Sequence, residues 1–338
     1  MPGPGWLAGL HYRVSSGGSI LCYHSLTTSE LPSPSIVNVP VDEYRSVMQL
    51  VGRCGEIAPL REVVRRHQAG LSTAGLIAVT FDDAYAAILA TVGDRPRGGR
   101  VPTTLFVVTD AARAGTSYWW DRVEDAFARV SPERWRAFED AIGLPTAYRM
   151  GQPAELGPLR PLRQWMLAAH RGRWPTSLEQ PLAELETAAG WTTRHRSMTF
   201  EELDRLASLP EVDIGVHTQT HAVLPLLSDE EVRTEILGSY HTLRERYAGK
   251  VVPLLAFPFG LFDGRTARLA NDVGIEAAFG LGNRTLRGVP RSGVLPRFIM
   301  AAGATRWRLA LKLLGVHERL RRGQGGALAC PALPSATS

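Results

Sequence analysis

The sequence has few cysteines, and their spacing argues against two common kinds of site. Cys22, Cys54 and Cys330 are the only three in the 338-residue chain, and no two of them form a Cys-x-x-Cys pair. A disulfide framework and a zinc site built from thiolates both need more cysteines at closer spacing. We therefore expect free thiols and a reducing compartment, which here means the cytoplasm.

Long apolar segments and a strong excess of one charge are also missing. No run of about 18 apolar residues occurs, so we expect no transmembrane span. The first 18 residues contain no basic segment followed by an apolar stretch, which argues against a secretory signal. The excess of 38 Lys and Arg over 33 Asp and Glu is only +5, which arginine-rich helices explain without a nucleic-acid partner.

What the sequence does contain is a regular alternation of strand-like and helix-like segments. Short apolar runs each lead into a turn, whereas residues 41–53 after Pro40 and residues 228–247 carry apolar residues three and four positions apart. This alternation predicts parallel βα units and an α/β fold, in which the side chains that follow the strands share one edge. The strand-like runs are 19–23, 76–81, 104–109, 212–216, 252–257 and 276–280.

Residues 117–196 interrupt the alternation, because they are rich in Trp, Arg and Glu and have a helical pattern broken by prolines. We interpret them as a helical insertion in a domain of residues 19–304, which follows an N-terminal extension of residues 1–18. Residues 305–322 carry an apolar stripe among Arg and Lys, typical of a helix that packs on the domain or contacts an anionic membrane. Residues 323–338 are small and polar, which predicts a disordered tail.

Two adjacent carboxylates, Asp82 and Asp83, directly follow the apolar run 76–81. Buried charge is costly unless it is paired, so carboxylates at this position need partners. One interpretation is a helix N-cap with an acidic first turn, which needs no cation. The other is a cation held nearby, and the choice depends on what else reaches the same edge.

His217 and His221 follow the run 212–216 and are four residues apart, so both imidazoles can reach one ion from one side of a helical turn. A histidine pair alone can equally be structural or solvated. Joined to the carboxylate of Asp83, however, the pair gives a three-ligand site with open positions, as a catalytic metal requires. Asp82 then lies beside the ion, where it can take a proton from the attacking water.

Three strings in this order, VTFDDAY, GVHTQTH and LAFPFG, resemble the first three motifs of the polysaccharide deacetylases, the NodB-homology domain of carbohydrate esterase family 4. ILCYHSL near the start and LPRFIM near residue 298 are similar to members that open with a Tyr-His pair. The similarity spans roughly residues 19–300, apart from the insertion. It implies a distorted (β/α)7 barrel, one divalent metal ion with Zn²⁺ as the expected species, and hydrolysis of N-acetyl groups on hexosamine-containing glycans.

The resemblance also implies roles for individual residues. Asp82 matches the general base. Asp83, His217 and His221 match the metal ligands. Thr218 matches the hydroxyl residue that braces the histidine loop.

Other positions match the family less closely. The N–H of Phe259 would face the developing oxyanion, although FPFG can equally be a simple hydrophobic turn. Many members orient the base with an Arg in the third motif, but residues 251–256 contain none, and Arg297 is either its replacement or a surface arginine. The usual late histidine acid is missing too. The Tyr-His pair nominates His24 instead, because histidine can release a proton near neutral pH, although a core histidine fits this position as well.

Three further residues are weaker candidates. Asp263, shortly after the FPFG turn, could support the site through hydrogen bonds. Trp119 and Trp120 in the insertion could stack on a sugar ring, since aromatic faces suit the apolar face of a carbohydrate. The alternative for both tryptophans is the core of the insertion.

Two other functions fit parts of the pattern. A non-haem Fe(II) oxygenase also uses two histidines and one carboxylate, but it leaves Asp82 without a task. A catalytically silent carbohydrate-binding relative would explain the missing late histidine, but the ligands and the base are retained. We therefore expect a cytoplasmic sugar N-deacetylase with no nucleic-acid partner. Its substrate would be an N-acetylated glycan, and a lipid-linked one would bring the protein into peripheral contact with the inner face of the membrane.

Overall fold

A computed structural model describes residues 17–28, 35, 37–92, 101–149, 159–286 and 293–303 of the chain. The predicted helix at 305–322 and the predicted tail at 323–338 lie outside these residues, as does the N-terminal extension apart from Gly17 and Gly18. Cys22 and Cys54 are buried free thiols, whereas Cys330 lies outside the described residues. In the part of the chain that the structure covers, no helix combines the length and apolar character of a membrane span.

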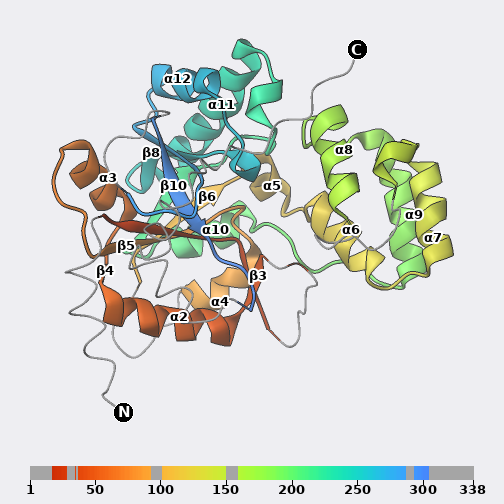
Figure 1. Cartoon of the computed structure of the whole chain (residues 1–338), viewed down its shortest axis with the longest axis horizontal. Coiled ribbons are helices and arrows are strands. Elements are labelled where there is room, and N and C mark those ends of the chain that lie inside the picture. The colour runs from red at the N-terminus through yellow and green to blue at the C-terminus, as the bar shows by residue number, and fades with distance from the viewer. Residues whose placement is uncertain are drawn as a thin grey trace, which may run out of the picture.

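Parallel strands close into a barrel at the centre of the molecule (Figure 1). They are β1 (Ser19–Tyr23), β5 (Leu76–Phe81), β6 (Thr103–Val107), β7 (Val212–Val216), β8 (Val251–Ala256), β9 (Ala277–Leu281) and β10 (Val294–Ile299). Their order is β1-β10-β9-β8-β7-β6-β5, and β5 closes the ring by pairing with β1 from Ser19↔Ile77 to Tyr23↔Phe81. The predicted α/β barrel of seven strands is therefore confirmed.

Three short strands lie outside the ring. β4 (Glu56–Ile57) extends the sheet along the beginning of β5, and β2 (Ser25–Thr27) pairs with β3 (Asn38–Pro40) in a separate two-stranded sheet. The chain returns to the ring at β5, so these short pairings leave the ring itself unchanged.

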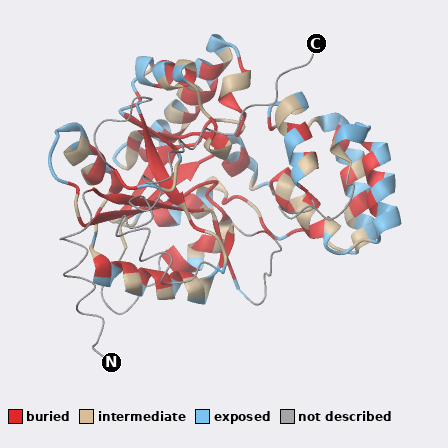
Figure 2. Ribbon diagram, in the orientation of Figure 1, coloured by how far each residue is buried: buried red, intermediate tan, exposed pale blue. Residues whose placement is uncertain are grey.

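The barrel strands are mainly apolar because both of their faces are covered. β1 and β5 are buried at every position, as a parallel sheet enclosed by helices requires. Ile20, Ala78, Phe106, Leu254 and Phe279 come from five different strands and belong to one buried cluster. Figure 2 shows the buried residues concentrated in the strands and on the inner faces of the surrounding helices.

Three of the described helices around the barrel begin at capping residues that their sequences supply. Pro40 precedes the first of the helices, and the last three start with capping boxes formed by Thr199, Ser228 and Asp263 with partners three residues later. The helices are α2 (Val41–Cys54), α3 (Leu60–Gln68), α4 (Leu89–Val92), α5 (Thr109–Ala114), α10 (Phe200–Ala207), α11 (Asp229–Tyr247) and α12 (Gly264–Asp272).

A helical lobe lies beside the barrel, between β6 and β7 in the chain (Figure 1). Its helices within the described residues are α6 (Trp119–Phe127), α7 (Pro132–Ala141), α8 (Arg160–His170) and α9 (Glu179–Ala189). Their inward faces form a separate apolar core that includes Trp135, Phe138 and Leu182. The lobe therefore has an apolar core of its own, separate from that of the barrel.

The core of the lobe gives a first prediction. Leu182→Ala removes a fully buried side chain, so it should lower the free energy of unfolding by about 2–5 kcal/mol. Urea denaturation followed by tryptophan fluorescence measures the change. Leu71→Ala is the control, because Leu71 is 53% exposed and its loss should cost no more than about 0.5 kcal/mol. Equal stability of the two variants would show that the lobe has no such core.

Candidate metal centre

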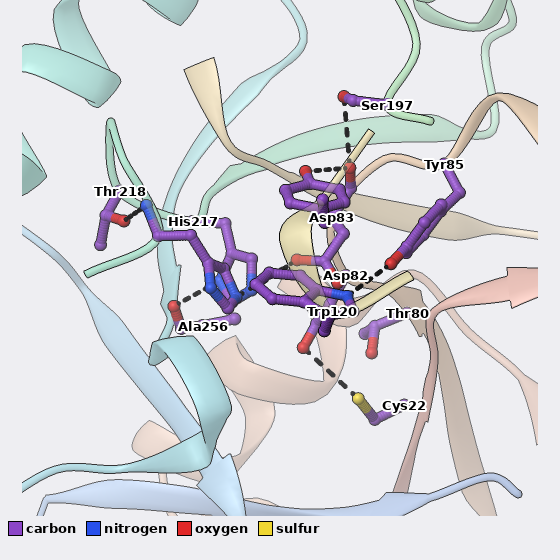
Figure 3. A network of polar contacts seen from close by, with 12 residues as sticks. Cys22, Thr80, Asp82, Asp83, Tyr85, Trp120, Ser197, His217, Thr218 and Ala256 are labelled. Atoms are coloured by element: carbon purple, nitrogen blue, oxygen red, sulfur yellow. Dashed lines mark hydrogen bonds and ion pairs between the residues drawn. The ribbon is translucent and has the colours of Figure 1, made fainter. Parts of the chain in front are cut away.

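The ends of β5 and β7 bring Asp83, His217 and His221 together. Asp83 Oδ1 lies 3.4 Å from His217 Nε2 and 3.3 Å from His221 Nε2. All three residues are buried, and one potential ligand atom of each lies within 4.8 Å of the others. Figure 3 shows Asp83 and His217 turned toward one another. The three residues that the sequence nominated as metal ligands thus share one small volume.

The donor set fits a divalent cation. Asp83 Oδ1 is buried and accepts no hydrogen bond from the described residues, an arrangement that is costly for a carboxylate without a cation close by. His217 Nδ1 lies 2.8 Å from the carbonyl oxygen of Ala256, so the tautomer that donates there leaves Nε2 free to bind an ion. Two imidazole nitrogens and one carboxylate oxygen are the ligands of a catalytic zinc site.

Burial and neighbouring charges act differently on the three groups. Burial lowers the pKa of His221 to about 3, which keeps this imidazole neutral, as metal binding requires. Burial also acts to lower the pKa of His217, but the Asp83 and Asp82 carboxylates outweigh it and raise the pKa above its usual value. For Asp83, burial acts to raise the pKa, and the facing His221 and His217 hold it below its usual value.

The backbone of the centre is held in a rare conformation. Asp83, Thr218 and His221 have φ values of 65°, 68° and 59°, a region that costs a non-glycine residue about 1–3 kcal/mol. The His221 N–H donates to Thr218 Oγ1 at 3.0 Å. The carbonyl oxygen of Asp83 accepts hydrogen bonds from the Tyr118 hydroxyl at 2.8 Å and the Ser197 hydroxyl at 3.4 Å. These contacts hold both ligand-bearing turns in place.

Asp82 forms a buried, bidentate ion pair with Arg297 of β10. Arg297 Nη1 and Nη2 each donate to one Asp82 oxygen at 2.7 Å, and Arg297 is fully buried. Burial acts to raise the pKa of Asp82, but the guanidinium charge outweighs it and holds the pKa well below the usual range. Asp82 is therefore ionised at neutral pH. The alternative that Arg297 is a surface arginine is wrong.

His24 and Cys22 lie next to Asp82. Cys22 Sγ donates a weak hydrogen bond to Asp82 Oδ2 at 3.5 Å, and potential ligand atoms of Cys22, His24 and Asp82 lie within 4.8 Å of one another. His24 is half-buried, and its Nδ1 has no hydrogen-bond partner within the described residues. The structure thus places the His24 imidazole beside the Asp82 carboxylate, and the Nδ1 atom of His24 remains able to form a hydrogen bond.

Aromatic rings cover one side of His221. The Phe259 ring packs edge-on against the imidazole, with centroids 4.5 Å apart, and the Trp120 ring lies 4.9 Å from it. Trp120 stacks on Tyr118 at 4.6 Å and donates from Nε1 to the Tyr85 hydroxyl at 2.9 Å. Because Trp120 and Phe259 are only partly buried, they form a wall that a ligand at the centre would meet.

A buried hydrogen-bond chain extends from this wall into the lobe. The Tyr85 hydroxyl, which accepts from Trp120, donates to the carboxylate of Asp121 in α6. Asp121 is only 3% exposed, and burial raises its pKa to about 7. The protonation state of a lobe residue is therefore linked through two hydrogen bonds to the Trp120 ring.

Two nominated residues have other roles. Trp119 is buried in the lobe, where it stacks on Trp174 at 5.8 Å and donates to the carbonyl oxygen of Gly172 at 3.0 Å. It belongs to the core of the lobe and not to a sugar-stacking surface. Asp263 caps α12 by accepting a hydrogen bond from the Thr266 N–H at 2.7 Å, which replaces the expected support of the site.

Sequence reasoning missed several residues of the centre, chiefly Tyr118, Tyr85 and Ser197. Their contacts join segments that are far apart in the chain, and no local pattern indicates them. Glu235 is different, because it lies on the buried face of α11, between Val232 and Ile236. A carboxylate between apolar positions of a helix face was a signal that could have been used.

Comparison with known proteins gives a family match over part of the chain and a shared fold over most of it. Residues 187–278, which include the histidine turn and the FPFG segment, match the family model named polysaccharide deacetylase. The Streptococcus pyogenes deacetylase PplD, solved in complex with acetate, is similar over 88% of this chain and 99% of its own, with a TM-score of 0.53 and 13% identity. The barrel is of the NodB type. No curated protein sequence matches the chain.

Two more solved structures share the NodB-type barrel. The polysaccharide deacetylase BC0361 from Bacillus cereus has a TM-score of 0.54 and 12% identity, over 88% of this chain and 69% of its own. IcaB from Ammonifex degensii has a TM-score of 0.53 and 14% identity, over 88% and 97%. The likeness extends over most of each chain, whereas so little identity shows a shared fold and no more.

The buried ion pair gives the next prediction. Arg297→Met leaves the Asp82 carboxylate buried without a partner, so the free energy of unfolding at pH 7 should fall by about 3–5 kcal/mol. The double variant Arg297→Met/Asp82→Asn removes the stranded charge and should recover part of this loss. Chemical denaturation of all three proteins measures both effects. If the double variant is no more stable than Arg297→Met, lost packing and not lost charge explains the result.

Asp121 should make stability depend on pH. Its pKa of about 7 in the folded protein exceeds the value near 3.9 expected in the unfolded chain, so the stability it contributes is complete below about pH 4 and disappears as the pH rises through 7. Asp121→Asn cannot titrate, and its amide oxygen can still accept from Tyr85. The decrease in unfolding free energy between pH 5 and pH 8 should therefore be about 2–3 kcal/mol smaller in the variant. Identical decreases in urea titrations would contradict the raised pKa.

Proposed function

We propose that this chain is a metal-dependent carbohydrate deacetylase, which hydrolyses the N-acetyl group of a hexosamine-containing glycan or sugar conjugate. The observation that carries the proposal is an ionised carboxylate, Asp82, fixed by Arg297 directly beside the ligand set of Asp83, His217 and His221. The family match and the NodB-type barrel support the same reaction class. PplD was solved with acetate, which is the product that this reaction would release.

Each residue of the centre then has a task. Asp83, His217 and His221 would hold a divalent ion, for which we propose Zn²⁺, and the bound ion would supply Lewis acidity. Arg297 keeps Asp82 ionised and oriented. Thr218 holds the turn of His221 through the hydrogen bond to its N–H.

Proton transfer would be divided between two residues. Asp82 accepts a proton from water as the water oxygen attacks the acetyl carbon, and the N–H of Phe259 is proposed as a donor to the oxyanion. The carbon–nitrogen bond then breaks, and His24 donates a proton to the leaving amine. The products are acetate and the free amino sugar. We also propose, from the Tyr23-His24 pair and the FPFG turn, that the chain belongs to the subgroup that takes its acid from the first strand.

The wall of Trp120 and Phe259 would form one side of the substrate site. Its position against His221 suits contact with the acetyl methyl group or with a sugar face, both of which are apolar. Trp119 takes no part in this surface. No observation favours an Fe(II) oxygenase, because the Asp82–Arg297 pair has no task in that chemistry.

The direct test is acetate release from N-acetylglucosamine oligomers and from a lipid-linked N-acetylglucosamine, with metal content measured in each protein. Asp82→Asn should retain the metal but lose about 10²- to 10⁴-fold in rate, because the general base is gone. His217→Ala should lose both metal and activity. Asp42→Asn, at an exposed carboxylate of α2, should behave like wild type.

The outcomes separate the parts of the proposal. Equal activity in all four proteins would show that the site is wrong. A wild type that binds one metal ion per chain but releases no acetate from either substrate would retain the metal centre and overturn the substrate class. Activity on only one of the two substrates would assign the polymeric or the lipid-linked class.

A further inference from the structure

A buried glutamate lies directly behind the turn that carries both histidines. We call residues 217–221 the histidine loop. Glu235 of α11 is 4% exposed, and its Oε2 atom accepts hydrogen bonds from two successive backbone N–H groups of the loop, those of Gln219 at 3.0 Å and Thr220 at 2.9 Å. Its Oε1 atom accepts the Thr220 hydroxyl at 2.7 Å. One carboxylate thus makes three hydrogen bonds between the two nominated ligands.

The lobe supplies the counter-ion of this carboxylate. Arg173, which follows α8, donates from Nη2 to Glu235 Oε1 at 2.7 Å and from Nε to Thr220 Oγ1 at 2.8 Å. The Thr220 hydroxyl therefore donates to Glu235 and accepts from Arg173. Lobe, histidine loop and α11 meet in one closed set of charged hydrogen bonds, which are stronger than neutral ones.

Close packing confirms that α11 is pressed against the loop. A Cβ atom built on Gly238, one turn after Glu235, would lie 2.4 Å from Cδ of the Gln219 side chain. Glycine inside a helix costs about 0.5–1 kcal/mol relative to alanine, so its presence here fits a requirement for close approach. On the lobe side, a Cβ on Gly172 would lie 2.7 Å from the Phe259 ring. The Gln219 side chain of the loop thus packs directly against the backbone of α11 at Gly238.

The loop needs such support because its conformation is unfavourable by itself. Thr218 and His221 both have left-handed φ values, and the residues that Glu235 binds are the two between them. A strained turn persists only where surrounding contacts over-determine it. If the N–H groups of Gln219 and Thr220 were released, the loop would lose two of the hydrogen bonds that fix the direction of His221 relative to His217.

We infer that Glu235, held by Arg173, is a positioning residue of the metal centre, which sets the relative placement of His217 and His221 and thereby the affinity and geometry of metal binding. The inference rests on the proposed function in one respect, namely that these histidines bind a metal ion. It also gives the lobe a part in the site, because Arg173 belongs to the lobe.

The test is Co²⁺ binding to metal-free full-length protein, measured by calorimetry and by the visible absorption of the bound ion. Glu235→Gln keeps the shape of the side chain but turns an N–H₂ group toward Arg173 and the histidine loop. Loss of such support behind a metal ligand typically weakens binding about 10- to 100-fold, and we expect a dissociation constant raised by that factor. The absorption spectrum should also change, which a merely less stable protein with an intact site would not show.

The chain offers a matched control. Glu231 lies one turn before Glu235 on α11 and pairs with Arg171, two residues before Arg173, at 3.0 Å. This pair joins the same two segments, but it is half-exposed, and none of its described contacts is to the histidine loop. Glu231→Gln can keep the capping hydrogen bond to Ser228, so it should bind Co²⁺ with wild-type affinity and spectrum.

A second variant protects the test against misfolding of Glu235→Gln. Arg173→Gln changes a side chain that is 37% exposed, so it should fold, and it should weaken Co²⁺ binding in the same direction by a smaller factor. Wild-type affinity and spectrum in folded Glu235→Gln overturn the inference. If that variant does not fold, wild-type binding by Arg173→Gln overturns it instead, as does equal weakening by Glu231→Gln.

Failure of the proposed function has a different signature. If Co²⁺ binding depends on Glu235 as expected but wild type releases no acetate from any sugar, the positioning role stands and the substrate is wrong. If wild type binds no Co²⁺ at all, the metal centre is wrong, and the inference is overturned together with it.

Discussion

The carboxylates of Asp82 and Asp83 lie side by side at one end of an apolar barrel. Burial of a carboxylate is costly, and each of the two is stabilised there by a different positive or polar partner. Asp82 faces the guanidinium of Arg297, which is fully buried and bonds both carboxylate oxygens. Asp83 faces two imidazoles. If both acids competed for one partner, one of them would have to take up a proton, because like charges at this separation oppose ionisation. On the proposed function, this division of partners leaves Asp82 for proton transfer and Asp83 for a metal ion.

The rest of the structure serves that division. Closure of the barrel by β1 against β5 and β10 places residues from both ends of the domain around Asp82, with Cys22 and His24 on one side and Arg297 on the other. The opposite part of the barrel, β7 and β8, delivers the histidine loop and the carbonyl oxygen of Ala256 that orients His217. The lobe contributes the Trp120 ring, which lies against His221, and Arg173, which contacts the histidine loop and Glu235.

How far the sequence predicts this site depends on whether the information is local. Asp82 and Asp83 follow one apolar run, and His217 and His221 follow another. Parallel strands end at the same edge of a sheet, so the pattern alone predicted that these residues lie close together. Only the family resemblance drew attention to Arg297 as a partner for Asp82, because nothing local separates a buried arginine in a strand from a surface one. The roles of these residues in catalysis remain predictions.

Contacts between segments that are distant in the chain could not be predicted from the sequence. Trp119 and Trp120 are neighbours with the same composition around them, yet one is in the core of the lobe and the other lies against His221. The direction in which α6 presents its first turn decides between them, and that direction depends on packing across the lobe. Asp263 likewise follows a motif closely, but a capping box with Thr266 accounts for it.

The arrangement of strands also bears on how the chain can fold as it leaves the ribosome. Asp82 and both histidines are synthesised well before Arg297, which belongs to β10, the last strand of the ring. Until β10 is inserted between β1 and β9, the Asp82 carboxylate lacks its guanidinium and the ring has a gap next to β1. A nascent chain that ends before this strand therefore carries a carboxylate without its guanidinium and two open sheet edges, and the Asp82–Arg297 pair forms only when β10 has joined the ring.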